Sequence, residues 1–176
     1  MNKDNIILIG MPGAGKSTVG VVLAKKLGYD FVDSDLVIQS RAGKLLHEII
    51  EEQGVEAFWA VEEETNASID VHGTVIATGG SAVYGSRAME HFRQIGTVVY
   101  LKLSCEAIAD RLGDLNERGV TLREGQTLPD LYAERVPLYE KYADSTIDCA
   151  ELSIREVVEL IHSCIKLTNL QKITVK

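Results

Sequence analysis

The stretch Gly10-Met11-Pro12-Gly13-Ala14-Gly15-Lys16-Ser17-Thr18 fits the pattern G-x-x-x-x-G-K-[ST] without a mismatch. The apolar run Ile6-Ile7-Leu8-Ile9 comes directly before it and predicts a buried strand, and residues 18–27 follow it with a helical pattern. A strand, a glycine-rich loop and a helix in this order are typical of a phosphate-binding P-loop. A glycine-rich turn that matches by chance would lack this context.

The residue types in this loop explain how it would bind phosphate. Glycines let the backbone close around phosphate oxygens, so that N–H groups point inward at the start of a helix. The nucleotide-binding residues that we predict are Gly13, Ala14, Gly15, Lys16, Ser17 and Thr18. Lys16 is expected to reach the β- and γ-phosphates and to be catalytic, and Ser17 to offer its hydroxyl to Mg²⁺.

The composition of the whole chain excludes several classes of protein. The 176 residues, 45% of them hydrophobic and 25% charged, predict one domain over residues 1–176. A net charge of -8 argues against general binding to nucleic acid or anionic membranes. No apolar run approaches the ~20 residues of a membrane span, and the N-terminus leaves no room for a signal peptide. The three cysteines lack metal-ligand spacing. We therefore expect a cytoplasmic monomer with no nucleic-acid or membrane partner.

Alternating strand and helix patterns predict a parallel α/β sandwich with right-handed crossovers. Further strands are expected at residues 31–32, 74–77, 97–101 and 145–148, and the polar segment 113–127 is interpreted as a lid. Ligands of such sheets collect at the carboxyl ends of the strands. The P-loop, the pair Asp33 and Asp35, and the turn Gly79-Gly80 would therefore share one crevice.

The acidic pair at the end of the second strand suits phosphoryl transfer. One carboxylate would hold Mg²⁺ through water, and the other would accept a proton from an attacking hydroxyl. The alternative is that Asp33 or Asp35 caps the helix expected to begin at Leu36. Because the pair faces a P-loop, a functional role for at least one of the two is favoured.

Three further features are candidates for ligand contacts. Gly79-Gly80 lets a ligand approach the backbone, or it is an ordinary turn. Arg118 in the expected lid would close over the triphosphate, or it is a solvated surface charge. Arg135 would hold a substrate anion, or it pairs with Glu134 or Glu140 on the helix surface.

The chain resembles the shikimate kinase family over about residues 5–162. The matching segments are Gly10 to Gly20, Phe31-Val32-Asp33-Ser34-Asp35, Ile76-Ala77-Thr78-Gly79-Gly80, Glu134-Arg135-Val136-Pro137-Leu138-Tyr139 and Tyr142-Ala143-Asp144. The resemblance implies a three-layer P-loop kinase fold with a five-stranded parallel sheet of order 2-3-1-4-5. It also implies a lid at about residues 113–127 and a helical substrate-binding region at about residues 36–71. The implied reaction is ATP- and Mg²⁺-dependent phosphorylation of shikimate to shikimate 3-phosphate, in aromatic amino-acid biosynthesis.

Residue by residue, the resemblance assigns ATP to Lys16, Mg²⁺ to Ser17 and Asp33, and the acceptor hydroxyl to Asp35. Gly79 and Gly80 would line the acceptor site. Arg118 would be the lid arginine that contacts the phosphates, and Arg135 would bind the substrate carboxylate.

The positions at which this sequence departs from the family pattern lie mostly around the expected binding site of the acceptor substrate. Trp59 stands where the family has an arginine that helps to bind the carboxylate, and Ser81 replaces a third glycine. Gln39 stands where an acid is frequent, and the lid reads Arg118-Gly119-Val120-Thr121 instead of Arg-Pro-Leu-Leu. Trp59 is placed in the acceptor site, or else it is a core aromatic of the helix expected over residues 56–69. Arg41 or Arg87 would be a substitute for the missing arginine.

Three functions are therefore compatible with the sequence. The first is a kinase for shikimate, and the second is a related kinase for another small hydroxy metabolite. The third is a nucleotide-binding module without turnover, against which the intact Lys16, Ser17, Asp33 and Asp35 argue.

Overall fold

Five parallel strands form the central sheet of the molecule. The computed structural model describes residues 3–112, 122–123 and 125–173. Its strands are β1 Asn5–Ile9, β2 Asp30–Asp33, β3 Thr74–Ala77, β4 Gly96–Lys102 and β5 Ser145–Asp148. They follow the order β2-β3-β1-β4-β5, and every neighbouring pair is parallel. The expected α/β fold and strand order are confirmed.

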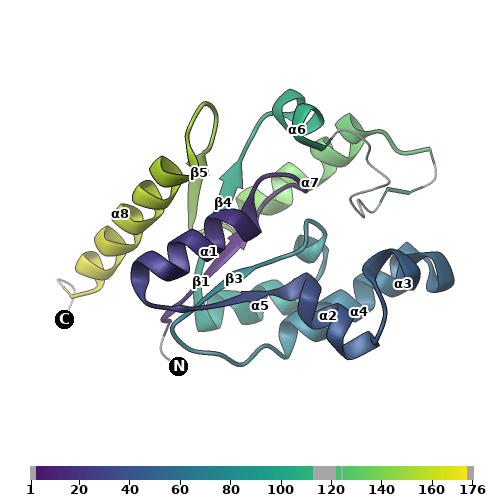
Figure 1. The fold of residues 1–176 in the computed structure, drawn as a ribbon, viewed down its shortest axis with the longest axis horizontal. Helices are drawn as coiled ribbons and strands as arrows, with labels where there is room; N and C mark the ends of the chain where they lie inside the picture. Colours follow the sequence, from purple (N-terminus) through teal and green to yellow (C-terminus); the bar gives the residue numbers. More distant parts are fainter. Residues whose placement is uncertain (1–2, 113–121, 124, 174–176) are drawn as a thin grey trace.

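Helices cover both faces of this sheet (Figure 1). On one face α1 (Lys16–Leu27) packs on β1, β2 and β3 and against α8 (Ile154–Ile173). On the other face α5 (Ser86–Ile95) and α7 (Leu128–Tyr142) pack on β4. Strands β1 and β3 are buried along their whole length, as their uninterrupted apolar sequences predict. The rigid centre of the sheet thereby fixes the loops at its carboxyl edge.

Three helices form a lobe beside β2. They are α2 (Ser34–Ala42), α3 (Leu46–Gln53) and α4 (Val55–Ala67), and they share a separate apolar cluster of Ile38, Ile49 and Phe58. They fall within the region predicted to bind substrate. The short helix η1 (Ala82–Tyr84) and α5 both contact α4, and η1 also contacts α7, so this lobe meets the sheet near the end of β3.

Several element boundaries differ from the expected ones. Helix α2 begins at Ser34 instead of Leu36, because Asp33 caps it by accepting a hydrogen bond from the Asp35 N–H. Helix α7 continues through Pro137, which was a possible break. Helix α8 extends to Ile173, whereas fraying was expected beyond Asn169. Helix α6 (Cys105–Leu112) has the expected cap, since its Ala107 N–H donates to the Ser104 hydroxyl.

The expected lid lies mostly outside the described residues, which omit 113–121 and 124. Arg118 therefore stays a sequence-based prediction. Across the described residues, every helix is too short or too polar to span a bilayer.

Candidate active site

The P-loop connects β1 to α1 in the conformation that its glycines permit. Gly13 and Gly15 have φ angles of 76° and 93°, in the left-handed region that other residues rarely adopt. The Lys16 ammonium donates to the carbonyl oxygens of Gly10 at 2.8 Å and Met11 at 2.9 Å. Burial lowers the pKa of Lys16 to about 8, although the negative charge of Asp35 opposes this shift. The lysine side chain is thus held by carbonyl groups of the loop that precedes it.

One cavity of about 470 Å³ contains most of the predicted site residues. Its lining consists of Pro12, Gly13, Gly15, Lys16, Ser17, Thr18, Asp35, Thr78, Gly79, Gly80, Arg111 and Leu112. The P-loop, the second acidic residue and the glycine turn therefore share one crevice, as the alternation of strands and helices predicts. Arg111 was not predicted, because a single arginine at the end of a helix carries no distinctive sequence signal.

Ser17 and Asp33 meet at the edge of this cavity. The Ser17 hydroxyl donates to Asp33 Oδ2 at 2.7 Å, while Asp33 Oδ1 caps α2. These two hard oxygen groups suit Mg²⁺, which binds few protein ligands and keeps water and phosphate oxygens around it. No group of three or more acidic, histidine or cysteine side chains suited to a metal occurs in the described part of the chain. A Mg²⁺ ion here would thus depend on the nucleotide for further ligands.

Asp35 occupies the first turn of α2 and its carboxyl group is directed inward. Its Oδ1 atom is buried and has no hydrogen-bond partner among the described residues. Burial, followed by the charge of Asp33, raises the pKa of Asp35 to about 6, and Lys16 opposes this effect. A carboxylate with this pKa is suited to accept a proton near neutral pH.

A second buried carboxyl group, that of Glu62 on α4, was missed by the sequence reasoning. Its side chain is 1% exposed, and its Oε1 atom has no hydrogen-bond partner in the described structure. Burial raises the pKa of Glu62 to about 7, while a hydrogen bond from Ser81 lowers it. In the sequence Glu62 is one of three consecutive glutamates, and only the helix register shows which of them is buried.

Gly79 separates these two carboxyl groups. A Cβ atom at this position would lie 2.4 Å from Glu62 Oε1 and 2.7 Å from Asp35 Oδ1. The glycine is therefore required by the close approach of both side chains. Its N–H donates to the Ser34 hydroxyl at 3.3 Å, so this amide already has a partner.

A smaller pocket adjoins the main cavity on the side of the helical lobe. Its lining includes Pro12, Asp35, Leu46, Phe58, Gly79, Gly80, Ser81 and Arg135. Arg135 is 1% exposed, which excludes the surface alternative considered for it. Tyr139 fixes the adjacent turn by donating its hydroxyl hydrogen to the Gly80 carbonyl at 2.6 Å. The predicted residues Asp35, Gly79, Gly80 and Arg135 thus surround one pocket.

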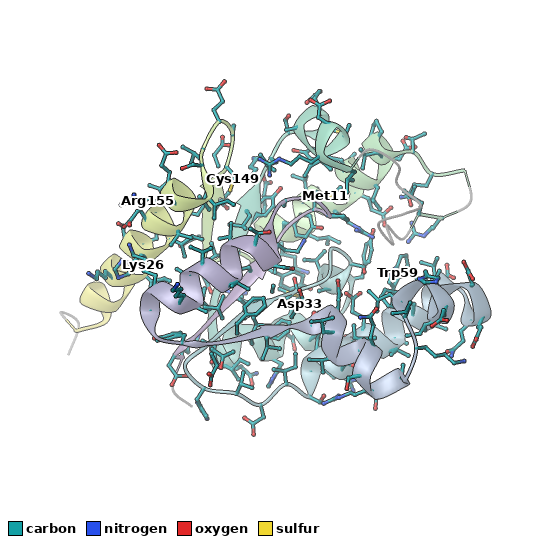
Figure 2. The ribbon with its side chains drawn as sticks, viewed as in Figure 1. Met11, Lys26, Asp33, Trp59, Cys149 and Arg155 are labelled. Atoms are coloured by element: carbon teal, nitrogen blue, oxygen red, sulfur yellow. The ribbon has the colours of Figure 1, made fainter. Side chains whose placement is uncertain are left out.

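Trp59 lies on α4 (Figure 2) and is not among the residues that line this pocket. Its ring packs on Tyr84 with centroids 4.5 Å apart, and the Arg123 guanidinium lies 5.0 Å from the ring centroid. Its role in binding substrate stays a prediction. Of the proposed substitute arginines, Arg41 donates to the Ser68 hydroxyl and Arg87 lines a separate groove between α4 and α5.

This fold and this crevice define a P-loop phosphotransferase. The family model described as shikimate kinase matches residues 12–166. A shikimate kinase of Geobacter sulfurreducens is 40% identical over 165 residues, covering 92% of this chain and 91% of that protein. One of Thiobacillus denitrificans is 38% identical over 164 residues, covering 91% and 89%.

Solved structures agree with these relatives. The shikimate kinase of Acinetobacter baumannii in complex with shikimate has a TM-score of 0.84 and 35% identity, with 94% of each chain covered. That of Aquifex aeolicus has a TM-score of 0.80 and 31% identity, with 94% of this chain and 98% of that chain covered. The chain therefore belongs to the shikimate kinase family, which consists of ATP-dependent kinases that phosphorylate a hydroxyl group.

Proposed function

We propose that this protein transfers the γ-phosphoryl group of ATP to a hydroxyl group of shikimate. The observation that carries the proposal is the position of Asp35, whose unpartnered carboxyl oxygen lies between the lysine of the P-loop and the pocket of Arg135. The shikimate-bound structure of the Acinetobacter baumannii relative supports the choice of acceptor.

The nucleotide would occupy two adjoining cavities. The triphosphate would occupy the cavity of about 470 Å³ beside Lys16. A neighbouring cavity of about 260 Å³ shares Gly15, Thr18 and Arg111 with it and is lined further by the apolar side chains Val19, Cys149, Leu152, Ile154 and Val157. An adenine ring suits such apolar walls, and the shared arginine would lie next to the phosphates.

Mg²⁺ would be held by the Ser17 hydroxyl and, through water, by Asp33, and it would neutralise charge on the phosphates. The acceptor would bind where the main cavity meets the smaller pocket of about 30 Å³, beside Asp35, Gly79 and Gly80, with its carboxylate directed toward the Arg135 guanidinium. This arrangement orients one acceptor hydroxyl toward Asp35 and the phosphate loop.

The reaction then follows from the positions of these groups. The acceptor hydroxyl gives its proton to Asp35, and its oxygen forms a bond to the γ-phosphorus. The bond between that phosphorus and the bridging oxygen of ADP breaks, and Lys16 stabilises the charge that develops there. The products are ADP, which keeps the bond electrons, and a phosphate ester. We further propose a cytoplasmic setting, which the three free thiols of Cys105, Cys149 and Cys164 support.

The test is an assay of ADP release with shikimate and Mg²⁺. Turnover that depends on shikimate, and that Lys16→Ala reduces at least about 100-fold, is the expected result. ATP binding without turnover on any acceptor would favour the nucleotide-binding module.

A second candidate is a kinase that acts on a different small hydroxy metabolite. Trp59 favours it, because a tryptophan cannot form the ion pair that the family's arginine makes with a carboxylate. The same assay with hydroxy acids, polyols and amino alcohols separates the two candidates. Turnover with one of these acceptors and none with shikimate would establish the second and exclude the first.

A further inference from the structure

Tyr84 contacts Arg135 through both its hydroxyl group and its ring. The Nε–H of Arg135 donates to the Tyr84 hydroxyl oxygen at 3.2 Å, and the guanidinium carbon lies 5.1 Å from the centroid of the tyrosine ring. One aromatic side chain of η1 therefore restricts both the position and the rotation of the buried guanidinium.

Tyr84 is itself held from the other side by Trp59. The two rings are tilted by 42° with centroids 4.5 Å apart, a geometry that is favourable for aromatic pairs. Arg123 packs on Trp59 and forms a two-oxygen ion pair with Glu134, at 3.2 Å and 3.0 Å. The contacts thus form a closed circuit that runs from Arg135 through Tyr84, Trp59 and Arg123 to Glu134 and back to α7.

We infer that Trp59 and Tyr84 are positioning residues that fix the Arg135 guanidinium for an acceptor carboxylate. This inference deepens the proposed function and rests on it, because it takes Arg135 as the anion-binding group. Trp59 here does not replace an arginine as an ion partner. It supports the ring that orients the arginine already present in the pocket.

The physical reason is the planarity of guanidinium. A two-point interaction with a carboxylate requires the plane and the N–H groups of the arginine to be oriented correctly. A side chain that must find this orientation on binding loses rotamer freedom, which weakens the affinity. The Tyr84 hydroxyl takes up the Nε–H, and the tyrosine ring restricts the plane. Removal of either support is expected to weaken recognition of the carboxylate specifically.

The experiment compares shikimate with its methyl ester, which lacks the negative charge, in steady-state kinetics. Tyr84→Phe keeps the ring and loses the hydroxyl, whereas Trp59→Leu loses the ring that supports it. Both variants are expected to raise the KM for shikimate about 3- to 10-fold, to leave the KM for ATP within about twofold, and to change the KM for the ester little. Trp59→Phe, which keeps an aromatic ring, is expected to restore most of the preference for the acid.

A control and a second measurement separate positioning from general damage. Tyr132→Phe removes a tyrosine hydroxyl group of α7 that donates to the Leu103 carbonyl at 2.9 Å, and it should leave the preference for the acid over the ester unchanged. The Nε–H resonance of Arg135 in the ¹H–¹⁵N spectrum, assigned with Arg135→Lys, should shift in Tyr84→Phe and not in Tyr132→Phe.

The possible outcomes are distinct. An Nε–H resonance that does not move in Tyr84→Phe overturns the inference, and so does an unchanged preference for the acid in both Tyr84→Phe and Trp59→Leu. A wild-type protein that turns over neither shikimate nor its ester refutes the proposed function instead. In that case the resonance alone decides whether Tyr84 positions Arg135.

Discussion

Gly79 determines how closely the two buried carboxyl groups approach the acceptor pocket. Gly79→Ala would place a methyl group 2.4 Å from Glu62 Oε1 and 2.7 Å from Asp35 Oδ1, so both side chains must move. We expect a loss of about 1–3 kcal/mol in the free energy of unfolding, the usual cost of overpacking, and at least about a tenfold loss of kcat/KM for the acceptor. Urea denaturation and steady-state kinetics measure the two effects.

Gly28→Ala is the control for this substitution. Gly28 caps α1 with a φ of 68°, and a Cβ atom there would meet nothing within 4 Å. Gly28→Ala should lower the free energy of unfolding by about 1 kcal/mol through backbone strain and leave kcat/KM unchanged. Equal catalytic losses in both variants would contradict a specific role for Gly79.

Asp35→Asn tests the proton acceptor directly. The amide keeps the size of the side chain but cannot take a proton from the acceptor hydroxyl, so kcat should fall about 10²- to 10⁴-fold. The KM for ATP should change little, because the contacts that we propose for ATP are made by residues of the P-loop and not by Asp35. In the wild type, kcat/KM should rise with pH through the region of the Asp35 pKa, about 6, as the carboxylate forms. An unchanged kcat in the variant would exclude Asp35 as the base or hydroxyl anchor.

The sequence revealed those site residues that belong to a local pattern. Lys16, Ser17 and Gly15 follow a fixed spacing, Asp33 ends a recognisable strand, and Asp35 follows it two residues later. Glu62, Tyr84 and Arg123 follow no such spacing. They meet the site only because α4, η1 and the segment before α7 converge beside β3, and that packing depends on contacts between residues distant in sequence.

Two helices that line the site carry matching caps. Thr127 caps α7 by accepting from the Asp130 N–H, and Asp130 in turn accepts from the Thr127 N–H. At the start of α8, Ser153 and Glu156 make the same reciprocal pair. These are capping boxes, in which each side chain satisfies an otherwise unpaired amide.

Thr127→Ala and Ser153→Ala should therefore lower the stability of the protein by similar amounts but affect the binding of different substrates. Each should lower the free energy of unfolding by about 1 kcal/mol, which corresponds to a melting temperature about 2–4 °C lower. Because α7 carries Arg135, Thr127→Ala should raise the KM for the acceptor. Because Ile154 and Val157 of α8 line the second cavity, Ser153→Ala should instead raise the KM for ATP. If both variants changed the KM for the acceptor and the KM for ATP equally, the separate roles of α7 and α8 would be contradicted.

The bounds of helices and strands were predicted correctly where burial imposes an apolar pattern on the sequence. They were predicted less well where a capping residue or the length of a helix sets the boundary. Thr74–Ala77 and Leu128–Tyr142 have the predicted bounds, because an apolar run and a clear helical period mark them. The start of α2 was misplaced, because Asp33 can end a strand and cap a helix at once. The extension of α8 to Ile173 was missed, since the polar Thr168-Asn169 pair reads as an ending.

At the scale of the whole molecule, the buried carboxyl groups link stability to pH. The pKa of Glu62 rises from 4.5 to about 7 on folding, and that of Asp35 rises from 3.8 to about 6. Between these values the folded state binds more protons than the unfolded state, so the free energy of unfolding falls as pH rises. The pKa of Lys16 is lowered to about 8, so this residue affects the pH dependence of the free energy of unfolding only above that pH.

We therefore expect the ligand-free protein to be more stable at about pH 5 than at about pH 7.5, by on the order of 1–3 kcal/mol. Urea denaturation at constant ionic strength across this range measures the difference. Glu62→Gln removes one titrating group and should flatten the profile. A stability that stays constant or rises over this interval would show that Glu62 and Asp35 are not protonated in the folded state.

The lowered pKa of Lys16 has a chemical consequence. With a pKa of about 8, Lys16 carries a substantial fraction of free amine at pH 8, whereas an ordinary lysine is almost wholly charged. Its amine lines a cavity large enough to admit a small acylating reagent. Limited acylation followed by peptide mass spectrometry should modify Lys16 ahead of exposed lysines such as Lys44, and ATP should protect it. Lys16, which we propose to neutralise the phosphates of ATP, is therefore also expected to be a target for covalent inhibitors.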